Sequence, residues 1–326
     1  MVNLRFCFMN DPELSSTTGR HSMKDATSRV LWVVTDEKPG HRSQQEGLVE
    51  RLQALASFDV FWLNVESLDI SLLDVLLRRR IKPELPAPDW ILGAGAGTHS
   101  LILKLKRIFR AKTILLMRGA FPMALFDANI TPVHDNPPKR RNVLPTTGVM
   151  NPVVPRYEGR DEHTGTFLIG GVNDHYQWDD AWIIEQVARI CRAQPQVQWT
   201  LTDSRRSPDA FLPALKALAL PNLTLISYRD TQRGFIKQQL DTTGQLWVTR
   251  DSVSMVYECI TSGAATGLLD LKPLRQSRVV KDMDKLLQQG WVQDYAQWDI
   301  QQPLPVTETK LWEADRGARW LLDFLR

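Results

Sequence analysis

A stretch near three-quarters of the chain combines residue types that bind anions and hydroxyl groups. An apolar run ends at Val248, Thr249 to Ser252 are residue types that favour helix starts, and helical spacing begins at Val253. The N–H groups at such a start attract anions by about 0.3–2 kcal/mol. Glu258, near the start of this helix, has a carboxylate suited to accept hydrogen bonds from the hydroxyls of a ribose. The pattern also fits a capped core helix with a solvated Glu258, ended by Gly263.

Two earlier loops carry groups suited to phosphate. Gly170-Gly171 follows a predicted strand, and a glycine pair lets backbone approach a diphosphate closely, although a structural turn explains the pair equally well. Arg205 and Arg206 precede Pro208 at a predicted helix start, and guanidinium groups are suited to phosphate oxygens. If these loops belong to one parallel sheet, they converge with Thr249 to Ser252 at its carboxyl edge.

His41 is the candidate general base. It follows Pro39-Gly40 in a predicted loop, and an imidazole titrates near physiological pH. A histidine of this kind is also common on protein surfaces without any catalytic role. Asp36 and the pair His134-Asp135, which lie at predicted strand ends, are weaker candidates for the same role.

Metal chemistry has little support in the sequence. The six histidines show no ligand spacing, and the three cysteines are too few for a disulfide framework. Asp282 and Asp284 form a D-x-D pattern, but they fall within a predicted helix over residues 280–289, so we expect a solvated face. We therefore predict no metal site and no cofactor other than a donor substrate.

Composition excludes several classes of protein. Hydrophobic residues make up 43% and charged residues 24%, values typical of a soluble globular protein. The net charge of +3 is too small and too dispersed for a nucleic-acid binder. Apolar runs fall short of the roughly 18 residues that span a membrane, and the start lacks a signal core. We expect a cytoplasmic protein.

The elements that position these residues alternate regularly between strand and helix. Continuous apolar strands such as Val30 to Val34 are typical of parallel sheets buried on both faces. The fold class predicted is therefore α/β, with two doubly wound Rossmann-like domains facing a cleft. We divide the chain into a disordered tail (1–28), an acceptor-side domain (29–155), a nucleotide-sugar domain (156–310) and a C-terminal helix (311–326) that crosses back to the first domain.

A basic helix is predicted over residues 98–112. Lys104, Lys106, Arg107, Arg110 and Lys112 make this helix and its exit strongly cationic. Such a face is usually solvated, but it is also a candidate for peripheral contact with anionic lipid headgroups at the inner face of a membrane.

Several of these segments together resemble a known family. They are Lys38-Pro-Gly-His41-Arg-Ser-Gln, Pro132-Val-His-Asp135, Asn142-Val, Thr147-Gly-Val-Met-Asn151, Ile169-Gly-Gly171, Ser204-Arg-Arg-Ser-Pro208, and Thr249-Arg-Asp-Ser-Val-Ser-Met255 with Glu258 and Gly263. In this order they are similar to the conserved blocks of the mitochondrial-fission "elongated mitochondria" family, from about Val30 to Leu271. Its bacterial branch is regarded as a group of GT-B-type glycosyltransferases. More distantly, the two-domain plan resembles the peptidoglycan and lipid A sugar transferases.

The resemblance implies a role for each matched residue. The donor pocket would be lined by Ser252, Ser254, Met255 and Glu258, with Glu258 on the ribose. The diphosphate would be held by Gly170, Gly171, Arg205 and Arg206. His41 would face the acceptor.

The leading hypothesis is a metal-independent glycosyltransferase. It would move a sugar from a nucleoside diphosphate sugar to an unknown acceptor, for which a lipid-linked or cell-envelope molecule is a candidate. Two alternatives remain open, a non-catalytic adaptor on the same fold and a nucleotide-sugar 2-epimerase.

Overall fold

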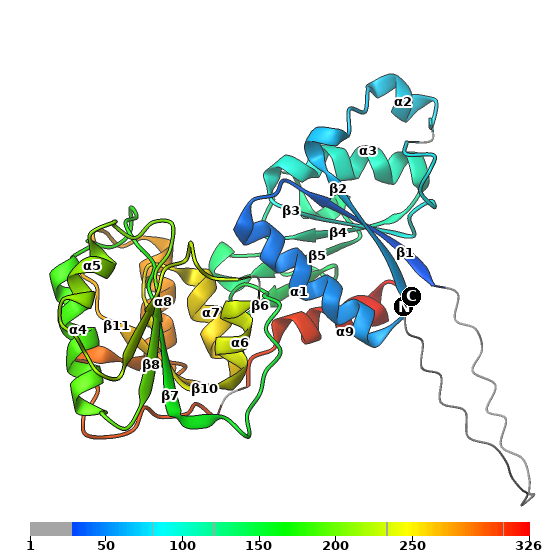
Figure 1. The fold of residues 1–326 in the computed structure, drawn as a ribbon. Helices are drawn as coiled ribbons and strands as arrows, with labels where there is room; N and C mark the ends of the chain where they lie inside the picture. Colours follow the sequence, from blue (N-terminus) through cyan, green and yellow to red (C-terminus); the bar gives the residue numbers. More distant parts are fainter. Residues whose placement is uncertain (1–27, 80, 120, 233, 309) are drawn as a thin grey trace, which may run out of the picture.

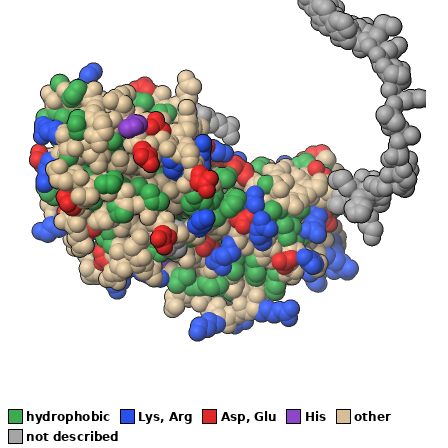
Figure 2. Space-filling view, turned by 90° about the horizontal axis from the view of Figure 1, so that it is seen from below, with side chains coloured by type: hydrophobic (Ala, Val, Ile, Leu, Met, Phe, Trp, Pro, Cys, Tyr) green, Lys and Arg blue, Asp and Glu red, His purple; other side chains and the backbone are tan. Residues whose placement is uncertain are grey.

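The protein consists of two lobes, each built on a six-stranded parallel sheet (Figure 1). The computed structural model describes residues 28–79, 81–119, 121–232, 234–308 and 310–326. The tail predicted for residues 1–28 lies outside these ranges except for Ser28. Acidic and basic side chains are interspersed over the face seen in Figure 2, as the small net charge indicates.

The first sheet has the strand order β2-β1-β3-β4-β5-β6, with all neighbours parallel. Its strands are β1 (Arg29–Thr35), β2 (Phe58–Asn64), β3 (Trp90–Ala94), β4 (Lys112–Leu116), β5 (Ala128–Pro132) and β6 (Val143–Thr146). The intervening helices are α1 (Pro39–Leu55), α2 (Leu72–Leu76) and α3 (His99–Phe109), with short 3-10 turns at η1 (Val65–Ser67), η2 (Ala96–Thr98), η3 (Met123–Leu125) and η4 (Val133–Asp135).

The second sheet has the strand order β12-β11-β10-β7-β8-β9. Its strands are β7 (Asp161–Leu168), β8 (Gln198–Thr202), β9 (Leu223–Ile226), β10 (Thr243–Thr249), β11 (Ala265–Leu269) and β12 (Gln293–Asp294). The helices are α4 (Asp180–Ala193), α5 (Phe211–Lys216), α6 (Phe235–Thr242), α7 (Val253–Ser262) and α8 (Arg278–Gln288), and η5 (Tyr295–Gln297) follows β12. Read from β9, the order is the 3-2-1-4-5-6 of a doubly wound sheet.

Apolar strands supply both layers of each core. In β1, Leu31 and Val33 pack on one face of the sheet, while Trp32 and Val34 pack on the other. This alternation follows from the two-residue period of a strand, and burial on both faces explains the continuous apolar run. The predicted fold class, two doubly wound α/β domains, is confirmed.

The helix α9 (Glu313–Phe324) follows the second sheet but packs on the first lobe (Figure 1). Ala318 and Leu321 enter the same apolar cluster as Leu48 of α1. Arg51 of α1 donates to Asp315 of α9 over 2.6 Å. The chain therefore links the two lobes twice, once between β6 and β7 and once before α9.

Each sheet has one switch point, where the strand order reverses direction. In the first sheet it lies between β1 and β3, and in the second between β7 and β10. Ligands of doubly wound folds bind outside the carboxyl ends of the strands at such points. The residues that follow β1, β3, β7 and β10 are thus the ones to inspect.

Candidate active site between the two lobes

Three loops of the second lobe meet at its switch point. The Gly170 N–H donates to Oγ1 of Thr249 over 2.8 Å, and the Ser204 hydroxyl donates to the Gly170 carbonyl over 2.6 Å. The Gly171 N–H donates to Oδ2 of Asp251 over 3.0 Å. The convergence of the loops after β7, β8 and β10 is therefore confirmed.

The side chain of Asp251 occupies the space between the three loops. The side chain of Asp251 is 0% exposed, and its Oδ2 lies 2.7 Å from a guanidinium nitrogen of Arg206. A Cβ on Gly170 would lie 2.3 Å from the Asp251 carboxylate, so only glycine leaves room for it. Asp251 is thus the anion held by Gly171 and Arg206, two groups that we expected to hold a diphosphate. Arg205 is exposed.

Helix α7 begins directly after this loop. Ser252 is its N-cap residue, without a side-chain capping bond, and Gly263 ends it at a φ of +85°, as predicted. Met255, on the same turn as Ser254, packs against the apolar core of the second lobe. Glu258 is the sixth residue of this ten-residue helix rather than near its start, and it lies one turn from Ser254 on the same face.

Glu258 lines a cavity of about 580 Å³ between the lobes. Trp62 at the end of β2 contributes to one wall of this first cavity, and Phe235 of α6 contributes to another. Burial raises the pKa of Glu258 to about 7, and a hydrogen bond from Ser43 of α1 opposes that rise. Although part of the carboxylate reaches the cavity, it is desolvated enough to titrate near neutrality.

His41 and Asp36 form a pair at the switch point of the first sheet. Nδ1 of His41 lies 2.9 Å and 3.0 Å from the two carboxylate oxygens of Asp36. Burial alone would raise the pKa of Asp36, but His41 and Lys38 together hold it below its usual value. Among the described residues, Nε2 of His41 has no hydrogen-bond partner. This is the arrangement of a base whose ring is oriented by a carboxylate.

The local backbone explains the position of the His41 ring. Pro39 occupies the first turn of α1, where its missing N–H is harmless, so the helix already includes the residues predicted to form a loop. His41 therefore lies on a helix rather than in a loop. Gly95 after β3 has a φ of +78°, and a Cβ there would lie 2.2 Å from the ring. Glycine at this position is what admits the imidazole.

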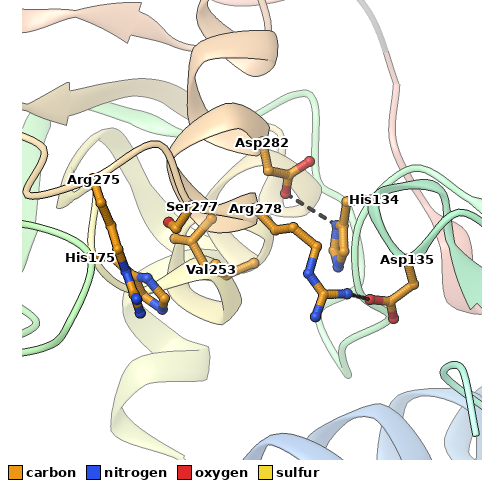
Figure 3. Close-up of a pocket in the computed structure, with 9 residues that line it drawn as sticks. His134, Asp135, His175, Val253, Arg275, Ser277, Arg278 and Asp282 are labelled. Carbon is orange, nitrogen blue, oxygen red and sulfur yellow. Dashed lines mark hydrogen bonds and ion pairs between the residues drawn. The ribbon is translucent and has the colours of Figure 1, made fainter.

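A second cavity, of about 390 Å³, lies where η4 of the first lobe faces α8 of the second (Figure 3). Asp135 lies 3.1 Å from a guanidinium nitrogen of Arg278, and Nδ1 of His134 lies 3.3 Å from Oδ2 of Asp282. Burial would lower the pKa of His134, but the nearby Asp282 carboxylate raises it above the usual value. Two ion pairs therefore cross between the lobes at this second cavity.

Asp282 does not lie on the solvated helix face that the sequence predicted. Its side chain is only 10% exposed, and it accepts a hydrogen bond of 2.9 Å from the Tyr257 hydroxyl. The predicted solvated face is therefore wrong, because α8 turns this residue toward β5 and α7 rather than toward water. In Figure 3, Arg275 and His175 lie on the other side of Val253 from His134.

Residues 39–325 match the mitochondrial fission ELM1 family. The chain belongs to this family. No protein of curated function matches the sequence significantly.

Solved structures with similar folds share little sequence with this ELM1-family chain. A Listeria monocytogenes protein assigned as a UDP-N-acetylglucosamine 2-epimerase has a TM-score of 0.51 at 12% identity, over 79% of this chain and 82% of its own. The Neisseria meningitidis UDP-GlcNAc 2-epimerase bound to UDP-GlcNAc gives 0.47 at 10%, over 91% and 99%. The E. coli ADP-heptose heptosyltransferase II gives 0.45 at 12%, over 80% and 99%. The likeness shows the fold, which is GT-B-like.

Sequence reasoning missed several residues that line the two cavities of this ELM1-family chain. They are Trp62, His175, Arg275 and Arg278, and Ser43, the partner of Glu258, was missed as well. Arg275 and Arg278 follow the β11 strand end, which was the available signal. Among the described residues, no cluster of three side chains is suited to hold a metal ion, and no described helix is long and apolar enough to cross a membrane.

Proposed function

We propose that this ELM1-family chain transfers a sugar from a nucleoside diphosphate sugar to an acceptor without a metal ion. The supporting observation is the position of helix α7, whose first residue lines one cavity while Glu258 lines the other. Five residues of helix separate Val253 from Glu258, a rise of about 7.5 Å. A nucleoside and a sugar joined by a diphosphate fit this arrangement.

Each part of the donor has a matching environment. The nucleoside would occupy the first cavity, where Glu258 would accept hydrogen bonds from the ribose hydroxyls and Trp62 and Phe235 would be apolar walls for the base. The diphosphate would lie at the first turn of α7, beside Ser252 and Ser254, because N–H groups there have no preceding helical turn to bond. The sugar would occupy the second cavity, between η4 and α8.

His41 is the proposed general base. Asp36 accepts from Nδ1–H, which leaves Nε2 to take the proton of the acceptor hydroxyl. The acceptor oxygen then bonds to the anomeric carbon, and the bond from that carbon to the diphosphate oxygen breaks. The departing diphosphate keeps the electron pair, and the α7 dipole and Arg275 would stabilise its charge.

The acceptor is proposed to be lipid-linked or part of the cell envelope.

Ser43 links the proposed acceptor and donor sites. It shares a helical turn with His41, the proposed base, and it hydrogen-bonds to Glu258, the proposed ribose ligand. Through this contact, the proposed base of the first lobe lies near the proposed donor residue of the second.

The first test is thermal stabilisation by uridine, guanosine, cytidine and adenosine diphosphates. We expect one base to stabilise the protein, and Glu258→Ala to weaken that ligand about tenfold or more through the lost charge-assisted bonds. Glu50→Ala is the matched control, because Glu50 lines the same cavity but is exposed. Stabilisation by none of the four nucleotides would leave the adaptor alternative.

Product analysis is the second step of this test. The donor that carries the selected nucleotide is incubated with envelope lipid extract, and the products are separated. A labelled lipid product supports transfer, whereas inversion at C2 of the unreacted donor would identify an epimerase and overturn the proposal.

A further inference from the structure

The short helix α2 presents an apolar surface to solvent. Leu72 is 80% exposed, Leu73 57%, Leu76 79% and Leu77 60%. The helix is held by a capping box in which Ser71 and Asp74 satisfy each other's backbone N–H groups. Exposed leucines scattered singly need no explanation, but four on one turn and a half mark an interaction surface.

A cationic cavity of about 420 Å³ lies beside this leucine tip, which we define as Leu72, Leu73, Leu76 and Leu77. Its lining carries five cationic side chains and one carboxylate: Arg78, Lys106, Arg107, Arg110, Lys112 and Asp127. Lys106 lies 3.0 Å from Asp127. Among the described residues, the other four cations have no carboxylate partner within ion-pair distance. The cavity is therefore suited to anionic oxygen ligands.

The leucine tip and the cationic cavity form one continuous surface. Arg78 follows α2 directly and lines the cavity formed mainly by the end of α3. Lys104 of α3 donates to the Ile70 carbonyl over 2.5 Å, which ties the two helices together. Figure 1 shows α2 and α3 at the tip of the first lobe, away from α7.

We propose that this surface docks on a membrane that contains anionic phospholipids. The leucines would enter the boundary between headgroups and acyl chains, and the cationic cavity would receive headgroup phosphates. We choose an anionic membrane as the binding partner because four cations without carboxylate partners in the described part of the chain lie beside the leucine tip, and these would attract negatively charged headgroups. The leucines also project outward from a short helix, whereas a groove would be needed to seat a partner helix.

The test is co-sedimentation of the full chain with vesicles of phosphatidylcholine, with and without phosphatidylglycerol. We expect binding only to the anionic vesicles, weakened by added salt. The double variant Leu72→Ser, Leu76→Ser should lower the partition coefficient at least about tenfold. The double variant Arg107→Gln, Arg110→Gln should lower it about fivefold for each charge removed. All four side chains belong to exposed residues, so the fold is retained.

Matched controls lie on the second lobe. Leu218→Ser with Val306→Ser removes exposed apolar side chains there, and Arg192→Gln with Lys216→Gln removes exposed charges. Neither control should alter vesicle binding. Equal binding to both vesicle types, no binding, or unchanged binding of the leucine variant would overturn the proposal. A dimer in light scattering that the leucine variant abolishes would identify a second copy of this chain as the occupant instead.

Soluble phosphate distinguishes the source of the anion. Inorganic phosphate added at the concentration of the lipid headgroups should leave vesicle binding unchanged, because the leucines contribute nothing to a free ion. Displacement from vesicles by inorganic phosphate would mean that the cavity is an ion site without membrane docking.

Discussion

Two clusters of charged residues differ in what surrounds their charges. The paired cluster consists of Gly170, Gly171, Arg206 and Asp251, in which Oδ2 of Asp251 has both a guanidinium and an N–H partner, while Oδ1 is buried without a hydrogen-bond partner among the described residues. The open cluster consists of Asp36, His41, Ser43 and Glu258. There Glu258 has one hydroxyl partner at the edge of a cavity, and Nε2 of His41 has none among the described residues.

The difference separates a structural role from a chemical one. A buried charge with its partners in place stabilises one arrangement of loops, and any ligand must compete with those partners. A desolvated charge with spare bonding capacity beside a cavity costs stability, and such costs are typical of binding and catalytic sites. The residue types at the paired cluster suggest phosphate binding, yet it is Glu258 of the open cluster that lines a cavity.

The largest expected effect is that of His41→Ala on transfer. Loss of a general base reduces the rate by about 10²–10⁴-fold, and donor affinity should change little, because His41 is assigned to the acceptor. Kinetics with saturating donor measure this effect. Asp36→Ala should give a smaller loss in the same direction, and His163→Ala, an exposed histidine, serves as control. Full activity of His41→Ala would remove the open cluster from the chemistry.

The next effect is that of Asp251→Ala on stability. Removing the fully buried carboxylate leaves the buried Gly171 N–H without its partner, at a cost of about 1–3 kcal/mol, whereas Arg206 is 41% exposed and keeps its bonds to the Gly171 and Val172 carbonyls. Urea denaturation measures the free energy of unfolding. The exposed pair of Asp209 and Arg229 supplies the contrast, since Asp209→Ala should cost less than about 1 kcal/mol. A stable variant that binds nucleoside diphosphate more tightly would show that Asp251 blocks an anion site.

The smallest effect is the pH dependence of stability caused by Glu258. Its pKa is raised from 4.5 to about 7 in the folded protein, so the contribution is full below pH 4.5 and is lost as pH rises through 7. The loss is at most about 3 kcal/mol, and less because part of the side chain reaches the cavity. Glu258→Gln should therefore be more stable than the parent at pH 8 and similar at pH 4.5, as followed by urea denaturation. Parallel pH profiles for the two proteins would contradict this assignment.

The fold was predictable because its signals are local. Continuous apolar strands such as β1 specify a sheet buried on both faces, and the regular alternation with helices leaves little choice but a doubly wound sheet. The start of α1 was placed too late, since Pro39 and Gly40 are read as loop residues although proline is well tolerated in a first helical turn.

The sequence predicted only those contacts of the site that follow from the positions of the strand ends. The meeting of Gly170 with Thr249 follows from strand order, but the insertion of Asp251 between Gly171 and Arg206 depends on a side-chain rotamer that spacing does not reveal. The approach of Ser43 to Glu258 depends on how the two lobes face each other. A contact between two lobes produces no regular spacing of residue types in either segment, so the sequence pattern does not predict it.

The packing of α9 on α1 has a consequence for the order of synthesis. The ribosome synthesises α1 long before α9, because all strands of the second sheet lie between them in the sequence. The apolar face of α1 that packs against Ala318 and Leu321 therefore stays uncovered until α9 is synthesised. During that interval, the apolar residues of α1 that α9 later buries are exposed to solvent. The nascent chain is therefore a candidate for chaperone binding at Leu48 and its neighbours, and that binding should end when α9 leaves the ribosome.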